Sequence, residues 1–175
     1  MNDAVTIPVT AKFTTSNGSA TVADADYTQH TDTLINIPAG SAGQTVTFTV
    51  DTGNDGKIEA DEAFTVTVDS THNDWTGVPQ APTGTIENDD TAGLSIANVS
   101  LAEGNGGGAT SFDFVVTLDN AVQDGFTVAY SVTHGTTDAG DFSGATSGTA
   151  NFTGSVGEIQ TVTIPVAADD TIEAD

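Results

Sequence analysis

The chain has 175 residues, of which 25 are Asp or Glu and only 2 are Lys or Arg, so its formal net charge is -23 at pH 7. A field of that sign repels nucleic acid and anionic lipid and attracts cations, which excludes polyanion binding as the expected function. The lack of Cys excludes disulfides, thiolate metal sites and Cys nucleophiles, and no apolar stretch approaches the roughly 20 residues that span a bilayer, so we expect no membrane insertion.

Alternating apolar and polar residues predict β-strands along the whole chain. The alternating sets are, in chain order, Val46, Phe48 and Val50; Phe64, Val66 and Val68; Phe112, Phe114, Val116 and Leu118; and Phe126, Val128, Tyr130 and Val132. Asn17-Gly18 and the glycine-rich residues 104–109 supply turns, and no segment has helical periodicity. The pattern predicts an all-β chain of immunoglobulin-like β-sandwiches.

Two acidic stretches recur in the same β context. The sequence NDGKIEADEAF (Asn54–Phe64) follows the run TVTFTV, and DDTIEAD (Asp169–Asp175) follows TVTIPV. Carboxylates gathered at strand ends are typical of an oxygen cage for a hard cation such as Ca²⁺. The alternative is a solvated face of an acidic protein, but matched order at strand ends favours metal binding.

Internal repetition divides the chain into two parts. Segment Val9–Tyr27 aligns with Phe126–Phe142, and the acidic run ENDD closes the first copy. We expect residues 1–90 to be the C-terminal part of one repeat and residues 91–175 the N-terminal part of a second, taken from a longer array. Neighbouring repeats or subunits are then expected to complete the open ends.

Several motifs in combination resemble the Calx-beta repeat, which was first described in sodium-calcium exchangers and is widespread in bacterial surface proteins. They are Glu-Gly after an early strand (Glu103-Gly104), Asp followed by an aromatic residue (Asp26-Tyr27 and Asp141-Phe142), the central Glu-x-x-Glu-x-Phe (Glu59, Glu62, Phe64) and the closing GTIENDD at residues 84–90. The resemblance covers essentially the whole chain. It implies tandem immunoglobulin-like sandwiches that bind Ca²⁺ at one end.

The resemblance also implies which residues hold the ion. In the first repeat they are Asp26, Asp55, Glu59, Glu62, Asp89 and Asp90, with Asn54 at a position usually filled by Asp and the backbone carbonyl of Lys57 as a further ligand. In the second repeat they are Glu103, Asp141, Asp169, Asp170, Glu173 and Asp175. Asn54 and Lys57 reduce the negative charge of the first set.

A different metal loop is also compatible with residues 51–62. Asp51, Gly56 and Glu62 fall at loop positions 1, 6 and 12 of an EF-hand, and only Gly53 at position 3 departs from that motif. The flanking runs alternate as strands do, whereas an EF-hand requires helices. The flanks therefore favour a loop between strands.

Catalytic patterns are absent from the sequence. His30, His72 and His134 fall at unrelated positions of the repeat, and no nucleophile elbow, phosphate-binding loop or H-E-x-x-H motif occurs. We therefore expect a non-enzymatic, calcium-stabilised stalk or scaffold repeat of an extracellular bacterial adhesin, filament or surface layer. The alternatives are a calcium sensor, and an adhesive tip in which Trp75 contacts a host or matrix glycan or protein.

Overall fold

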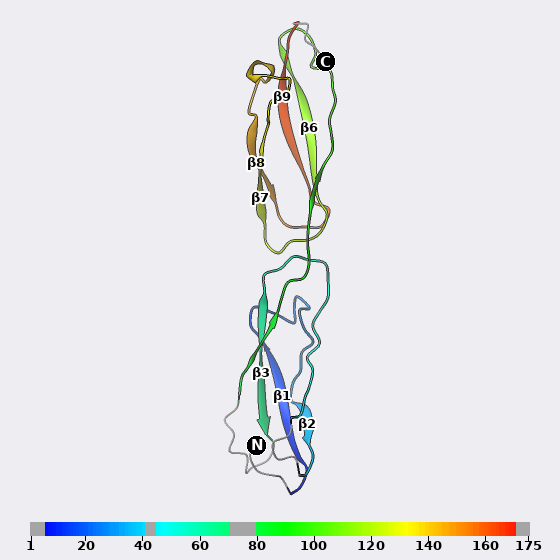
Figure 1. The fold of residues 1–175 in the computed structure, drawn as a ribbon, viewed down its shortest axis with the longest axis vertical. Helices are drawn as coiled ribbons and strands as arrows, with labels where there is room; N and C mark the ends of the chain where they lie inside the picture. The colour runs from blue at the N-terminus through cyan, green and yellow to red at the C-terminus, as the bar shows by residue number, and fades with distance from the viewer. Residues whose placement is uncertain (1–5, 41–44, 71–79, 171–175) are drawn as a thin grey trace. The chain divides into compact units, whose positions relative to one another are not determined.

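The computed structural model describes residues 6–40, 45–70 and 80–170 and separates the chain into two compact units (Figure 1). Unit 1 comprises Met1–Asp55 and Ala60–Asn88, and unit 2 comprises Gly56–Glu59 and Asp89–Asp175. In the described ranges, no helix has the length and apolar character needed to cross a membrane. Apart from one 3₁₀ turn, the regular structure of these residues is β, which confirms the all-β prediction.

The first repeat contains one four-stranded antiparallel sheet. Its strands are β1 (Val9–Asn17), β2 (Thr33–Ile37), β3 (Glu62–Ser70) and β4 (Thr83–Ile86). The order is β2-β1-β3-β4, and the register between the two central strands places Phe13 opposite Val68 and Asn17 opposite Phe64. The strictly alternating residues of β3 therefore lie on the same face as those of β1.

The core of the first repeat lies on that shared face of β1 and β3. Phe13 and Tyr27 are each 3% exposed, and the Tyr27 ring stacks on Phe64 with centroids 4.6 Å apart. Burying such a side chain contributes about 1.5–3 kcal/mol. The aromatic stack attaches the loop after β1 to the beginning of β3.

The strand expected at Val46–Val50 does not form, which corrects the sequence-based prediction. Residues 45–50 have no strand pairing, although Phe48 still stacks on Phe13 with centroids 4.2 Å apart. The matching run of the second repeat pairs with the strand at 108–118, and no described residue of the first repeat aligns with that strand. Alternation in the sequence is thus not sufficient for a strand, because a ladder also needs a partner.

The second repeat has two layers. Its elements are β5 (Leu94–Ile96), β6 (Gly108–Leu118), β7 (Phe126–Ser131), the 3₁₀ turn η1 (Ala139–Asp141), β8 (Ser147–Phe152) and β9 (Ile159–Ala168). Strands β5-β6-β9 form one sheet and β7-β8 a hairpin (Figure 1). Leu118, Phe152 and Ile164 belong to one buried cluster that draws on both layers, as in a β-sandwich.

Candidate metal centre

Two loops of the first repeat bring three carboxylates together. One oxygen atom from each of Asp26, Glu59 and Glu62 lies within 4.8 Å of the others. Asp26 and Glu59 are half-buried, and Glu62 is 9% exposed. Asp26 comes from the loop after β1, and the two glutamates come from the acidic stretch that leads into β3, where Glu62 is the first residue.

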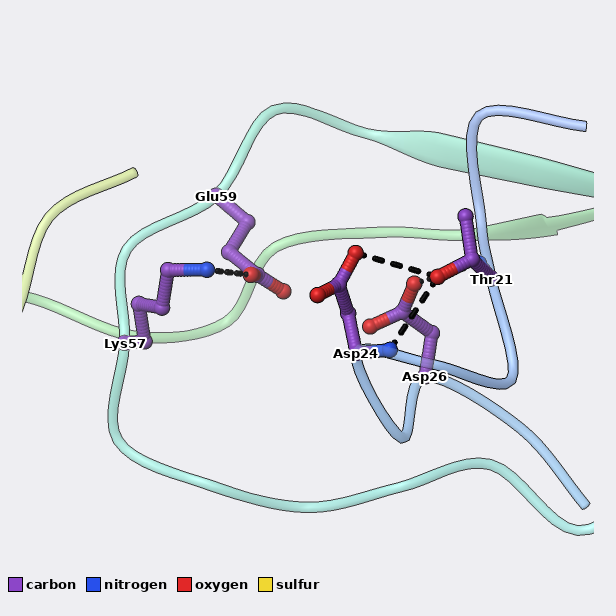
Figure 2. A network of polar contacts seen from close by, with 5 residues as sticks. All are labelled: Thr21, Asp24, Asp26, Lys57 and Glu59. Atoms are coloured by element: carbon purple, nitrogen blue, oxygen red, sulfur yellow. Dashed lines mark hydrogen bonds and ion pairs between the residues drawn. The ribbon is translucent and has the colours of Figure 1, made fainter. Parts of the chain in front are cut away.

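The Asp26 carboxylate is held by its own turn. The backbone N–H of Thr21 donates to Asp26 Oδ2 at 2.6 Å, and the Thr21 hydroxyl donates to Asp24 Oδ2 at 3.0 Å (Figure 2). The backbone N–H of Asp24 in turn donates to Thr21 Oγ1 at 3.1 Å. Such local bonds are typical of Ser, Thr and Asp in turns. They fix one oxygen of Asp26 before any ion binds.

Packing behind the carboxylates comes from Tyr27, the residue after Asp26. Its ring stacks on Phe64, and its hydroxyl donates to Asn17 Oδ1 at 2.7 Å. Glu62 is two residues before Phe64 in β3 and therefore shares the core face of the strand. This placement explains why a glutamate at the end of the sheet is so little exposed.

The only cation near the group, among the described residues, is Lys57. Its Nζ lies 2.5 Å from Glu59 Oε1, and the two side chains are 34% and 21% exposed (Figure 2). The sequence predicts a carbonyl ligand and a lower local charge at Lys57, but not this direct ion pair. The sequence feature that could have indicated the ion pair is the position of Lys57 two residues before Glu59.

The donor set fits a hard divalent cation. Ca²⁺ takes six to eight oxygen ligands at about 2.3–2.6 Å, so two oxygens on opposite sides of the ion lie roughly 5 Å apart. The three carboxylate oxygens lie within that span of one another. Oxygen-only ligands also disfavour the softer metals that prefer thiolate or imidazole.

The other acids predicted as ligands in the first repeat, Asp55, Asp89 and Asp90, are not part of this carboxylate group. Asp55 and Asp89 are exposed and Asp90 is half-buried, and the predicted ligand Asn54 is exposed as well. Conversely, Thr21 and Asp24 support the site without having been predicted. Their spacing of three residues is the polar turn signal that could have indicated them.

Among the residues that the structure describes, the candidate acids of the second repeat do not form a group of three within 4.8 Å. Asp141 ends η1 and accepts the backbone N–H of Asp138 at 2.7 Å. The carbonyl of Glu103 accepts the Thr110 hydroxyl. Asp169 and Asp170 are exposed after β9. Glu173 and Asp175 lie outside the described residues, as does Trp75 of the first repeat.

The EF-hand alternative is wrong. Glu62 begins strand β3, and residues 45–61 contain no helix. Gly53, which would be position 3 of the EF-hand loop, lies beside the turn that carries Asp26. Its N–H donates to the Asp26 carbonyl at 2.8 Å.

Comparison with known proteins agrees with the resemblance seen in the sequence. The chain matches the Calx-beta domain family over residues 1–90 and 93–175. Two solved structures with similar folds are the calcium binding domain CBD12 of CALX1.1, at 17% identity and a TM-score of 0.42, and CBD12 from CALX1.2, at 17% identity and 0.45. They cover 93% and 95% of this chain, which spans 64% and 66% of theirs, less than two thirds in either case. Curated proteins gave no match.

Proposed function

The chain belongs to the Calx-beta family, and from this premise we propose that it is a calcium-binding structural module. The observation that carries the proposal is the convergence of Asp26, Glu59 and Glu62, of which one oxygen atom each lies within 4.8 Å of the others. The proposed ligand core is these three carboxylates. Calcium supplies the positive charge that lets them remain close.

Electrostatics gives the reason for a bound cation. Two unit charges about 4 Å apart repel by roughly 4 kcal/mol at an effective dielectric of 20. Lys57 offsets part of this repulsion at Glu59, but one ammonium faces three carboxylates. A divalent ion held by all three would tie the loop after β1 to the beginning of β3 and stabilise this end of the sheet.

We further propose that the module is a stalk or scaffold repeat of an extracellular bacterial surface protein, in contact with neighbouring repeats of the same protein. The match of two consecutive segments to one domain family supports a repeat array. The affinity distinguishes this role from a sensor. Extracellular modules bind Ca²⁺ at about 10⁻⁴ to 10⁻³ M, whereas sensors bind at about 10⁻⁷ to 10⁻⁵ M.

The proposal assigns no catalytic role. The His30 ring contacts Phe13 and lies 3.2 Å from the Thr33 hydroxyl, and the His134 ring contacts Phe142. Both imidazoles are thus engaged in aromatic contacts, and neither belongs to the carboxylate group. This arrangement supports a binding module over a hydrolase.

Calorimetric titration with Ca²⁺ and thermal melting with and without EDTA test the proposal. The double variant Asp26→Asn/Glu59→Gln should lose the response of the first repeat. The matched control is Asp124→Asn/Glu87→Gln, which removes the same two charges from exposed acids outside the predicted set. At 100 times Kd one site adds about 2.7 kcal/mol, so the parent should melt several degrees higher in calcium. A parent melting curve that EDTA leaves unchanged would contradict calcium binding.

A further inference from the structure

The loop that carries Asp26 is hydrogen-bonded to the segment that leads into the acidic stretch. The N–H of Gly53 donates to the Asp26 carbonyl at 2.8 Å, and the N–H of Thr28 donates to the Asp51 carbonyl at 2.8 Å. The backbone of Asp26 is therefore fixed by residues 51–53, while its side chain is fixed by the Thr21 N–H. The carboxylate position depends on how closely these two backbones approach.

Gly53 makes that approach possible. A Cβ atom at residue 53 would overlap the carbonyl oxygen of Ala25 and lie 3.1 Å from its carbonyl carbon. The atoms in the way belong to the backbone, so no side-chain rotation can make room. Gly53 does not have a positive φ, so the need for glycine here is one of space.

The Ala25 carbonyl depends on an unusual backbone conformation. Ala25 has φ of 68°, in the left-handed region that non-glycine residues seldom adopt. It lies between Asp24 and Asp26. The turn is thus held in a strained shape at the point that contacts Gly53.

A second glycine holds the other end of the same loop. A Cβ at Gly18 would overlap the carbonyl oxygen of Ala63, which also accepts the N–H of Ala20 at 3.0 Å. Ala63 directly follows Glu62. The loop 18–27 is therefore fixed at Gly18 beside Glu62 and at Gly53 beside Asp26.

We propose that Gly53, assisted by Gly18, is a positioning residue of the calcium site. It allows the backbone contact that sets the distance from Asp26 to Glu59 and Glu62. This inference rests on the proposed function, because it assigns how the same three carboxylates are held. A residue that orients a metal ligand typically changes affinity by about 10- to 100-fold when it is altered.

The test compares two glycine-to-alanine changes in the same stretch of the full chain. Gly53→Ala should weaken calcium binding at least about tenfold. Gly56→Ala is the matched control, since a Cβ at residue 56 meets no atom within 4 Å, and it should bind as the parent does. Luminescence lifetimes of bound Tb³⁺ in H₂O and D₂O provide a readout that general destabilisation does not change: Gly53→Ala should admit additional metal-bound water.

A second pair of variants keeps the test decisive if Gly53→Ala does not fold. Ala25→Gly retains the left-handed conformation and should preserve the affinity, whereas Ala25→Val disfavours it and should weaken binding. Parent-like affinity in both Gly53→Ala and Ala25→Val would overturn the inference alone. Failure of the parent to bind Ca²⁺ would overturn the proposed function, and the inference with it.

Discussion

The turns that carry Asp26 and Asp141 occupy matching places in the two repeats and use the same local device. In each, the Oδ2 atom of the aspartate accepts a backbone N–H from its own turn, from Thr21 at 2.6 Å in the first repeat and from Asp138 at 2.7 Å in the second. An aromatic residue follows in both. The orientation of the aspartate side chain within its own turn is therefore determined locally in both repeats.

The two repeats differ in what lies behind that aromatic residue. Tyr27 donates its hydroxyl to Asn17 Oδ1 at 2.7 Å, whereas the Phe142 ring contacts His134 with centroids 5.4 Å apart. Asn17 and His134 both directly precede the glycine that follows the first hairpin strand of their repeat. One packing position is thus filled by a polar pair in the first repeat and by an aromatic pair in the second.

The largest expected effect comes from giving the first repeat the phenylalanine that the second repeat has at this position. Tyr27→Phe removes the hydrogen bond to Asn17 and should lower the free energy of unfolding by about 1 kcal/mol. The cost stays modest because Asn17 Oδ1 also accepts the N–H of Val22, at 3.3 Å. Thermal melting in EDTA isolates this effect from calcium binding.

The control for this change is Tyr130→Phe in the second repeat, which removes a hydroxyl from the only other tyrosine of the chain. Tyr130 is half-buried on β7, and its variant should melt close to the parent. Equal losses from the two tyrosines would mean that the bond to Asn17 contributes no specific stability.

Alternation in the sequence predicts the buried face of a strand but not the strand with which it pairs. Alternation in β3, β6 and β7 predicts strands correctly because a period of two specifies a buried face. The same pattern at residues 46–50 forms no strand, because alternation does not specify the partner that a ladder requires. Strand pairing is a property of the whole sheet.

The candidate site could likewise be predicted from the sequence only in part. The sequence predicts Asp26, Glu59 and Glu62 among the ligands, and these three lie together. The sequence does not distinguish them from the other acids of the first repeat, because the convergence of the carboxylates depends on backbone contacts such as that between Gly53 and Asp26. The number of carboxylates in the sequence predicts the kind of ion. Which of them act as ligands depends on how closely the loop after β1 approaches the acidic stretch before β3.

The ion pair at Glu59 gives the next comparison, between the two lysines that are the only basic side chains of the chain apart from His. Lys57 neutralises a proposed calcium ligand, whereas Lys12 pairs with Asp32 at 2.9 Å. Lys57→Gln should tighten calcium binding about two- to fivefold, the equivalent of one partly exposed ion pair. The variant keeps the backbone carbonyl of residue 57.

Lys12→Gln is the matched control, because it makes the same change in net charge away from the carboxylate group. Calorimetric titration of the two variants separates a local effect from a general one. If both tighten binding equally, the overall field of the protein is responsible; if neither does, Lys57 does not compete with the ion.

The smallest expected effect concerns a position at which the second repeat has Glu and the first has Gln. The second repeat has GSVGE at residues 154–158 where the first has GSAGQ at residues 40–44. The Glu158 carboxylate accepts the N–H of Thr153 at 2.8 Å, its hydroxyl at 2.8 Å and the N–H of Gly154 at 3.1 Å. The backbone hydrogen bond from Thr153 is the main cause that lowers the pKa of Glu158 below its usual 4.5.

Glu158→Gln gives the second repeat the residue of the first and should lower its melting temperature slightly at pH 7. A carboxylate whose folded pKa is depressed stabilises the protein above its unfolded pKa, and that stability is lost as the pH falls through the folded pKa. The difference between parent and variant should therefore shrink as the pH drops below about 4.5. Melting in EDTA from pH 7 to pH 3, with the exposed Glu87→Gln as control, measures it. A difference that persists unchanged at pH 3 would show that the shape of the side chain, and not its charge, closes this loop.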